Sequence, residues 1–432
     1  MRRTVSFKVD GIQKFKAQTL QWSHQFHESL WLDSNGHSNR HSSFESLLAI
    51  DALTVLQTDA VNAFDALEEY QARVNDWLFG YLSYDLKNDV EQLDSSNPDR
   101  LQFPELYFFQ PKKIIRIRHN AVDFIYLKMV EDEIELDFRS IMEGDFRIDK
   151  ESDPNNALRI RMGIFKDEYF KRVRRMLDHI HRGDIYEANF CQEFYAEDIQ
   201  INALRSYQKL NAISKPPFAC FLRFGDKYVL SASPERYLRK HGNKVVSQPI
   251  KGTARRSKDD VQDESLKASL ANDTKERAEN IMIVDLVRND LSKSALRGSV
   301  KVEELCGVYS FEQVHQMIST ISAEVAESQN PVALIRETFP MGSMTGAPKV
   351  SAMKIIEELE AFKRGLYSGT VGYFTPDGDF DFNVVIRSIL YHETKKKVSF
   401  SVGSAITAKA IPEKEYEECL LKAKAMREVL EG

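Results

Sequence analysis

The sequence predicts an α+β protein built around large antiparallel β-sheets. Segments with strand and helix periodicity alternate irregularly along the chain, whereas a doubly wound α/β sheet would show a regular strand–helix repeat. Of the 432 residues, 42% are hydrophobic, and 26 Phe and 16 Tyr supply large apolar side chains. This composition is sufficient for an extensive buried core. The chain contains no short internal repeat and no low-complexity segment.

The first part of the chain, residues 1–150, mixes short strands with helices. The spacing of apolar residues predicts a helix over residues 60–67. An aromatic run predicts a strand over residues 78–84, and two more apolar runs follow at 106–109 and 124–127.

The polar segment 151–156 contains Pro154 and is the best candidate for a linker. It separates the first region from a second region, residues 160–430. The elements expected in the second region are a helix over 166–181 that ends at Gly183, strands over 189–195, 219–224, 228–232 and 244–250, helices over 259–271, 274–292 and 347–359, a hairpin at 375–379, strands over 384–391 and 398–402, and a final helix over 413–430.

Composition excludes several classes of function. The net charge of −6 gives no support for a nucleic-acid partner or an anionic membrane. The N-terminal residues lack an apolar signal core, and no apolar run approaches the roughly 18 residues that span a bilayer. The cysteines lie far apart without the spacing of metal ligands, which indicates reduced thiols in a cytoplasmic protein. They are Cys191, Cys220, Cys306 and Cys419.

Lys251 is the most informative single residue. It stands in residues 249–253 (Pro-Ile-Lys-Gly-Thr), at the end of the expected strand 244–250. A strand end directs its last side chain into the space beyond the sheet, and Gly252 lets a ligand or the backbone approach closely. A partly desolvated lysine loses its proton near neutral pH and becomes a nucleophile. The alternative interpretation is a solvated lysine.

Two pairs of glutamates lie three residues apart on expected helices. Glu276 and Glu279 share one helix face, and Glu415 and Glu418 share another. If the two faces meet, four carboxylates surround a hard divalent cation, and Mg²⁺ suits such a site best. Alternatively the glutamates are solvated, with Lys422 as a surface ion-pair partner of Glu418.

Two further residues carry a chemical and a structural interpretation. Glu235 follows Ser233-Pro234, a good start for a helix, and is either a first-turn residue or a positioned proton donor. His315 lies in a strand-like or short helical segment and is either structural or part of a site. The glycine-rich loop 339–349 opens a helix but lacks the order and spacing of a Walker A loop.

These features occur together with further motifs along the chain. The motifs and their order resemble those of the chorismate-utilising enzymes, a family that includes anthranilate synthase component I, aminodeoxychorismate synthase component I, and the isochorismate and salicylate synthases. The resemblance is dense over residues 160–428; in residues 1–150, the variable region of the family, it is confined mainly to 79–85. The motifs that carry it are residues 183–190 (Gly-Asp-Ile-Tyr-Glu-Ala-Asn-Phe), 233–236 (Ser-Pro-Glu-Arg), 249–255 (Pro-Ile-Lys-Gly-Thr-Ala-Arg), 277–291 (Arg-Ala-Glu-Asn-Ile-Met-Ile-Val-Asp-Leu-Val-Arg-Asn-Asp-Leu), 346–349 (Gly-Ala-Pro-Lys), 367–373 (Tyr-Ser-Gly-Thr-Val-Gly-Tyr), 385–387 (Val-Ile-Arg) and 415–418 (Glu-Tyr-Glu-Glu).

The resemblance implies a fold and an activity. The fold would be a β-sandwich of antiparallel sheets with helices outside, in four α/β/β/α layers, and the N-terminal region would be intertwined with the catalytic region. Anthranilate synthases carry Ala where this chain has Lys251, and aminodeoxychorismate synthases carry Lys. The implied reaction is therefore Mg²⁺-dependent amination of chorismate by ammonia to 4-amino-4-deoxychorismate, on the way to p-aminobenzoate and folate, through a covalent Lys251 adduct. Anthranilate synthase component I, or an inactive or regulatory homologue, is the alternative.

The resemblance also implies a role for each site residue. Glu279 and Glu418 would bind Mg²⁺, and Glu276 and Glu415 would hold its waters. The catalytic residues would be Lys251, Glu235 as general acid–base, and His315, which together with Thr345 would line the pocket. The groups that would hold chorismate, a dianion, are Tyr367, Arg387, Lys422 and the backbone at Gly403, with Lys349 as a further local cation.

Two positions depart from the family pattern. Glu187 stands where most amino-transferring members have Gln and isochorismate-forming members have Lys. We interpret it as a polar substitution in the substrate pocket, although a glutamate there could also act as a base. The usual glycine-rich turn is altered to residues 403–406 (Gly-Ser-Ala-Ile). No glutaminase motif is present, so the ammonia is expected from a separate glutamine amidotransferase subunit.

Overall fold

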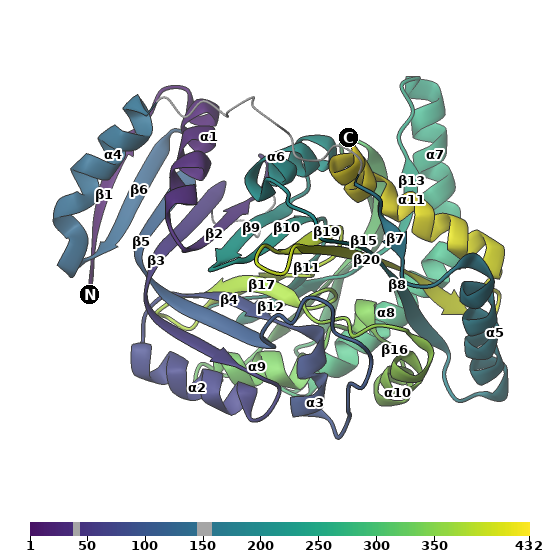
Figure 1. Ribbon diagram of the computed structural model, residues 1–432. Helices are drawn as coiled ribbons and strands as arrows, with labels where there is room; N and C mark the ends of the chain where they lie inside the picture. The colour runs from purple at the N-terminus through teal and green to yellow at the C-terminus, as the bar shows by residue number, and fades with distance from the viewer. Residues whose placement is uncertain (38–43, 145–157) are drawn as a thin grey trace.

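The computed structural model describes residues 1–37, 44–144 and 158–432 as strands wrapped by helices (Figure 1). All the strand pairings are antiparallel, as expected for an α+β protein. The linker expected at 151–156 lies outside the described residues. The proposed division of the chain at about residue 150 therefore stays a prediction.

The strands form two sheets that share β3 and β5. In the first sheet each strand pairs with the next in the order β7–β8–β20–β19–β10–β9–β2–β3–β5–β6–β1, and β16 also pairs with β8. Their bounds are β7 Arg161–Met162, β8 Glu187–Glu197, β20 Lys397–Thr407, β19 Ser388–His392, β10 Lys227–Ser233, β9 Phe218–Phe224, β2 Glu28–Asp33, β3 Ser46–Thr58, β5 Leu106–Arg118, β6 Ala121–Leu127, β1 Arg2–Lys8 and β16 Gly346–Ala347.

The second sheet leaves the first at β5 and continues through β4, β17, β18, β11, β12 and β15, with β13 and β14 paired to β15. The long strand β5 makes this branching possible, because its first residues pair with β4 and its last residues pair with β6. The bounds are β4 Leu78–Leu82, β17 Thr370–Phe374, β18 Phe380–Asn383, β11 Arg236–His241, β12 Lys244–Gln248, β15 Val314–Glu324, β13 Ile250–Arg255 and β14 Lys301–Ser310.

The main core lies between the two sheets. It joins Leu222 and Val229 of the first sheet to Leu238 and Phe382 of the second, all of them buried. Apolar faces of two sheets that cover each other in this way define a β-sandwich. A second core fills the space between the first sheet and its helices, and includes Phe400 and Met426.

Helices cover the outer faces of both sheets (Figure 1). Helices α5, α6 and α11 pack on the first sheet, and α8 packs on β13, β14 and β15 of the second, with α9 beside it. This arrangement confirms the predicted α+β fold. The bounds are α1 Ile12–Trp22, α2 Ala63–Val74, α3 Lys87–Val90, α4 Ile134–Glu143, α5 Lys166–Arg182, α6 Ala203–Ser214, α7 Asp260–Asn272, α8 Thr274–Ser292, α9 Pro331–Thr338, α10 Lys349–Leu359 and α11 Pro412–Glu431.

Three local predictions were wrong. The strand expected over 244–250 stops at Gln248, because Pro249 has no N–H to donate to a ladder, and a new strand, β13, carries Lys251. No helix starts at Ser233-Pro234: the Ser233 hydroxyl accepts the Glu235 N–H, and the chain passes directly from β10 to β11. The strand expected from residue 384 begins at Ser388, just after Arg387, which has a left-handed φ of 52°.

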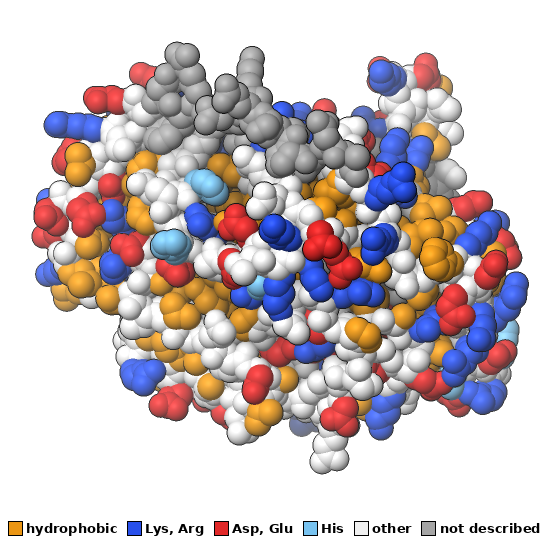
Figure 2. Space-filling view, in the orientation of Figure 1, with side chains coloured by type: hydrophobic (Ala, Val, Ile, Leu, Met, Phe, Trp, Pro, Cys, Tyr) orange, Lys and Arg blue, Asp and Glu red, His pale blue; other side chains and the backbone are white. Residues whose placement is uncertain are grey.

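The surface in Figure 2 carries acidic and basic side chains interspersed with apolar ones. This mixed surface agrees with a net charge of only −6 in 432 residues. None of the helices in the described ranges is long and apolar enough to cross a membrane.

Candidate active site

Lys251 lies on β13, where the strand is locally irregular. The register with β15 shifts between Ile250 and Thr253, and Gly252 has a φ of 92°, which glycine adopts without steric cost. A Cβ at Gly252 would lie 3.2 Å from Glu276 Oε2, so the missing side chain also lets β13 approach α8 closely. The bulge at this glycine therefore sets Lys251 beside the acidic face of α8.

The Lys251 ammonium is buried among carboxylates. Its Nζ lies 3.4 Å from Oε1 of Glu187, and the lysine side chain is 12% exposed. Burial acts to lower the pKa of Lys251, but the charges of Glu187, Glu279 and Glu235 outweigh it and raise the pKa above its usual value. The expectation that Lys251 is neutral near pH 7 was wrong for the free protein, because it considered desolvation without the three acids.

Glu187 begins β8 and is almost fully buried. One of its oxygens contacts Lys251, and the other, Oε2, has no hydrogen-bond partner. A buried carboxylate oxygen without a partner is costly unless a ligand or water completes its contacts. Glu187 is thus a direct neighbour of the lysine and the nearest described acceptor for its proton.

Glu235 approaches the same lysine from the short connection between β10 and β11. Burial raises the pKa of Glu235 to about 7, although hydrogen bonds from Ser343 and from the Ile250 backbone, together with the charge of Lys251, act in the opposite direction. A carboxyl group with a pKa near 7 is partly protonated at neutral pH and can therefore donate a proton. The structure therefore gives Glu235 the properties of a general acid.

The two glutamate pairs on α8 and α11 face each other across Lys275. The Lys275 ammonium lies 3.6 Å from Glu279 Oε1 and 3.4 Å from Glu415 Oε1, so it bridges the two helices. Burial raises the pKa of Glu279 to about 7 and also raises those of Glu276 and Glu415, with the neighbouring carboxylates adding to the effect. Lys275 thus joins the two helices that carry the glutamate pairs, and the role of the four carboxylates in holding a metal stays a prediction.

The same acids have the chemistry of a divalent-cation site. Among the described residues no cluster of three or more His, Cys, Asp or Glu side chains is close enough to ligate a metal as it stands. Glu279 Oε1, however, is buried without a hydrogen-bond partner. An excess of buried carboxylates with raised pKa values and an unpartnered oxygen fits Mg²⁺, which prefers oxygen ligands and retains water.

Two cations lie next to the acids: Lys422, in the middle of α11, and Arg387, just before β19. Lys422 donates to the Gly403 carbonyl at 2.9 Å and lies 2.5 Å from Glu418 Oε1. Arg387 donates to the Lys422 carbonyl at 3.5 Å, and its pKa is lowered by burial despite the nearby Tyr367 and Glu418. The residues assigned to chorismate binding at these positions are therefore neighbours in space.

Gly403 and the residues after it continue regularly through β20. A Cβ at Gly403 would lie 2.5 Å from the Cys191 sulfur, so this position requires glycine. Ser404 and Ala405 pair with Phe190 and Asn189 of β8 without positive φ angles. Replacement of the usual glycines here therefore needs no unusual backbone.

Tyr367 and Thr345 lie on loops beside β8. The Tyr367 hydroxyl is 3.8 Å from the Cys191 sulfur, and the Thr345 carbonyl accepts the Asn189 N–H at 2.7 Å. Both residues are buried, and both loops contact the strand that Glu187 begins. Both predicted pocket residues therefore contact the same strand.

His315 and Lys349 have other partners. Both ring nitrogens of His315 are occupied, by Ser310 at 2.9 Å and by Asp263 at 3.0 Å. These contacts fit a structural position, and its role in the pocket stays a prediction. Lys349 bonds to Asp290 and to two backbone carbonyls, so the structure does not place it with the cations near Lys422.

Sequence reasoning missed Lys275, the cation at the centre of the glutamate cluster. A signal for it was present, because Lys275 precedes Glu276 and stands four residues before Glu279 on the same helix. That spacing is typical of a surface ion pair, and only the arrival of α11 makes it part of the site.

This combination of a buried lysine, an acid with a pKa near 7, and carboxylates beside Lys422 and Arg387 marks the candidate active site. The chain belongs to the chorismate binding enzyme family, whose sequence profile matches residues 27–428.

Individual relatives support this placement. The chain is 35% identical over 376 residues to an anthranilate synthase component I-like protein of Synechocystis sp., covering 86% of this chain and 76% of that protein. It is 40% identical over 265 residues to aminodeoxychorismate synthase component 1 of Salmonella typhimurium, covering 61% of this chain and 58% of the relative. The crystal structure of anthranilate synthase component I from Streptococcus pneumoniae has the same fold, with a TM-score of 0.77 and 24% identity over 90% of this chain and 95% of that one.

Proposed function

We propose that this protein aminates chorismate at C4 with ammonia, forming 4-amino-4-deoxychorismate for p-aminobenzoate and folate synthesis. The observation that carries the proposal is Lys251, a buried primary amine set among Glu187, Glu235 and Glu279. An anthranilate-forming relative has no need of an amine at this position. The names of the aminodeoxychorismate synthase relatives support the same activity.

Chorismate carries two carboxylates, and the site offers matching groups. Arg387 and Lys422 supply positive charge, and the Tyr367 hydroxyl, whose only described hydrogen-bond contact is to a sulfur, is available as a donor. Bidentate and charge-assisted hydrogen bonds of this kind orient a planar dianion. We assign these three residues to substrate binding.

Glu279 and Glu418 would bind Mg²⁺ directly, with Glu276 and Glu415 holding its coordinated waters. When bound, the ion would neutralise the buried carboxylates and a carboxylate of chorismate. Lys275 bridges Glu279 and Glu415 in the free protein, so its ammonium would compete with the ion for these two carboxylates.

The residues around Lys251 supply the proton transfers. Glu187 takes a proton from the Lys251 ammonium, and the neutral amine attacks C2 of the ring. Both ring double bonds shift towards C4, and the C4 hydroxyl leaves as water with the proton that Glu235 donates. Ammonia then attacks C4, both double bonds shift back, and the C2–N bond to Lys251 breaks. The proton released from the incoming ammonia returns to the pair of acids.

The ammonia would come from a separate glutamine amidotransferase subunit. The support for this is the relative from Salmonella typhimurium, whose name designates it component 1. In the absence of such a partner, ammonium salts would replace it at high concentration.

The direct test is the identity of the product. The protein is incubated with chorismate, Mg²⁺ and ammonium, and the products are separated and weighed by mass spectrometry. The expected product is 4-amino-4-deoxychorismate, and Lys251→Ala should form it about 10³-fold more slowly or worse, since the variant loses the covalent route. Unchanged turnover by Lys251→Ala would contradict the covalent route.

The second candidate is anthranilate synthesis, which the similarity to anthranilate synthase component I proteins favours. In that case ammonia would attack C2 and Lys251 would only line the pocket. Anthranilate is fluorescent, so its appearance in the same incubation, with normal formation by Lys251→Ala, would replace the first assignment by the second.

A further inference from the structure

Arg364 is a fully buried cation just before the loop that carries Tyr367. A guanidinium has five N–H donors, and at Arg364 all five have acceptors. Nε and one Nη2 donor bind the two oxygens of Glu360 at 2.9 and 2.6 Å. The remaining donors bind the Met344 carbonyl at 2.7 Å, the Asn189 carbonyl at 2.7 Å and, more weakly, the Ser368 hydroxyl at 3.5 Å.

Each of these last three acceptors adjoins a residue assigned to the pocket. Met344 precedes Thr345, Ser368 follows Tyr367, and Asn189 lies two residues after Glu187 on β8. The three segments are distant in sequence but converge on one planar group. The arginine therefore links the segments directly, through the backbone carbonyls of Met344 and Asn189 and, more weakly, through the side chain of Ser368.

The guanidinium itself is held in one orientation. Glu360 also accepts the Cys191 backbone N–H at 2.8 Å, which ties the ion pair to the middle of β8. The Tyr84 ring lies 4.5 Å from the guanidinium carbon and covers one of its faces. With a bidentate carboxylate on its edge and an aromatic ring on its face, Arg364 has little freedom to rotate.

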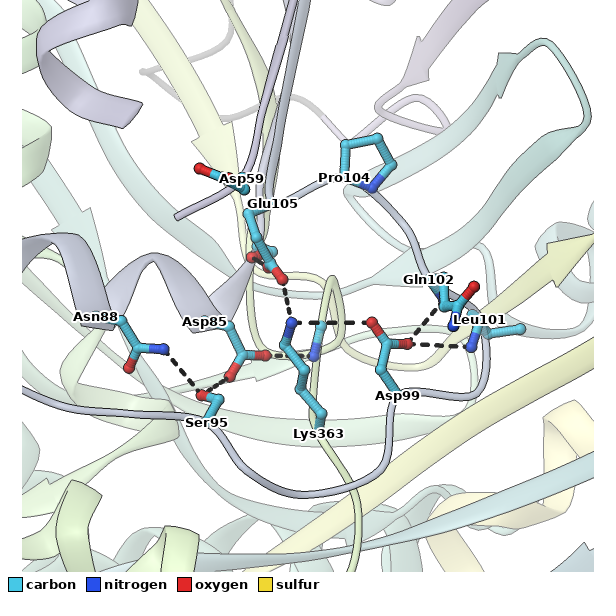
Figure 3. A network of polar contacts seen from close by, with 12 residues as sticks. Asp59, Asp85, Asn88, Ser95, Asp99, Leu101, Gln102, Pro104, Glu105 and Lys363 are labelled. Carbon is cyan, nitrogen blue, oxygen red and sulfur yellow. Dashed lines mark hydrogen bonds and ion pairs between the residues drawn. The ribbon is translucent and has the colours of Figure 1, made fainter. Parts of the chain in front are cut away.

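The residues on either side of the arginine are anchored as well. Lys363 lies between Glu105 and Asp99, and the Gly365 N–H donates to Asp85 Oδ2 at 2.7 Å (Figure 3). The segment that leads into Tyr367 is thus held at three consecutive residues by partners from the N-terminal part of the chain and from β8.

We propose that Arg364 is a positioning residue that sets the spacing of the Tyr367 loop, the Thr345 loop and the Glu187 strand around the substrate ring. The inference rests on the proposed function, because it takes these three segments as the walls of the chorismate pocket. Stability alone is a poor explanation for the arginine, since well-packed apolar side chains often stabilise a core as well as a buried ion pair does.

The test uses Arg364→Lys, which retains the charge but has three donors in place of five and lacks the planar guanidinium that holds the three segments at fixed positions. Initial rates of chorismate consumption are measured with Mg²⁺ and saturating ammonium, well below the thermal midpoint of each variant. We expect a higher KM for chorismate and a fall of about 100-fold in kcat/KM, the order of loss that follows a displacement of about 1 Å in a site. Circular dichroism at the assay temperature establishes the folded fraction.

Arg172→Lys is the matched control. Arg172 donates to the Leu359 carbonyl, next to Glu360, and to Glu168, so it holds the same end of α10 without touching the pocket segments. Its KM and kcat should remain within about twofold of the parent protein. If Arg364→Lys does not fold, Tyr84→Leu decides the question: it removes the ring from the guanidinium face, retains all five hydrogen bonds, and should raise KM in the same direction by a smaller factor.

A folded Arg364→Lys, or in its absence a folded Tyr84→Leu, with the KM and kcat of the parent protein would overturn the inference. The inference would also be overturned if the fall in the rate of the variant were no larger than its unfolded fraction explains. Failure of the proposed function gives a different result, because the parent protein would then consume no chorismate or would form a product without the C4 amine.

Discussion

Lys251 and Lys349 both have largely buried side chains beside α8, but their ammonium groups differ in how many partners they have. The Lys349 ammonium lies 2.5 Å from Asp290 Oδ2 and also donates to the carbonyls of Thr338 and Pro340. Among the described residues the Lys251 ammonium has one ion pair, at 3.4 Å, with Glu187, whose other oxygen has no hydrogen-bond partner.

The difference separates a structural lysine from the lysine that we propose to be reactive. Three acceptors satisfy the three donors of Lys349 and leave no capacity for a ligand. Around Lys251 the negative charge exceeds the positive charge, and several groups have pKa values displaced towards neutrality. Incomplete pairing is costly in a folded protein and is therefore concentrated where a ligand completes it.

The largest effect expected from this comparison concerns Glu235. Glu235→Gln removes the proton donor and should lower kcat/KM for chorismate on the order of 10²–10⁴-fold. Because the pKa of Glu235 is raised to about 7 and the acid form is the active one, kcat/KM of the parent protein should fall as the pH rises through 7. Rates from pH 6 to 9 at a fixed concentration of free ammonia measure this. A pH profile identical in Glu235→Gln would contradict the role.

The second prediction compares the two lysines directly. Lys349→Met leaves the buried Asp290 with Lys293, at 3.3 Å, as its remaining cation, and should lower the free energy of unfolding by about 2–3 kcal/mol. Lys251→Met should cost less than about 2 kcal/mol, because its acidic neighbours can take up protons instead. Urea denaturation at pH 7 gives both values. The comparison fails if Lys251→Met is the more damaging change, or if folded Lys349→Met has lost chorismate turnover.

The third prediction concerns stability and pH in the absence of Mg²⁺. The pKa of Glu279 is raised from 4.5 to about 7 in the folded protein. Its favourable contribution is therefore complete below its unfolded pKa and is lost as the pH rises through 7. At pH 8 the buried Glu279 carboxylate is ionised, which destabilises the folded protein. Glu279→Gln should remove this cost and stabilise the protein at pH 8 by about 1–3 kcal/mol. Equal unfolding free energies of parent and variant at pH 5 and a clear gain at pH 8 are expected; a loss at pH 8 would contradict the account.

The smallest expected effect is the release of protons when Mg²⁺ binds. Binding of Mg²⁺ requires ionised carboxylates, so at pH 7 it should release a fraction of a proton from Glu279. Calorimetric titration of Mg²⁺ in two buffers of different ionisation enthalpy measures the release. Glu279→Gln should abolish it, and binding without any proton release in the parent protein would show that the ion occupies another place.

The site could be predicted from the sequence where chemistry follows local spacing. The i, i+3 spacing puts each glutamate pair on one face of α8 or α11, and Lys275 joins the two helices. The break at Pro249 was missed, although the sequence carries its signal, because a proline cannot donate within a ladder. The pKa of Lys251 could not be predicted, as it depends on acids from three distant segments, at residues 187, 235 and 279.

The fold shows the same division between local and long-range information. The helices α5, α7, α8 and α11 follow apolar periodicity and N-terminal or C-terminal signals, and lie within a few residues of the expected ranges. The branching of the two sheets at β5 could not be predicted, since it depends on the long-range pairing of β5 with β3 and β4, whereas β6 follows β5 in a local hairpin. Arg364 was missed for this reason too: its acceptors are brought together only by the folded sheet.

The most direct test of the central claim is the mass of the enzyme itself. Protein mixed with chorismate and Mg²⁺ without ammonia is quenched with acid, digested and analysed by mass spectrometry. We predict a peptide in which Lys251 carries one chorismate less one water, absent from Lys251→Ala and lost when ammonium is added before the quench. An unmodified Lys251 peptide from a protein that still converts chorismate to 4-amino-4-deoxychorismate would contradict the claim.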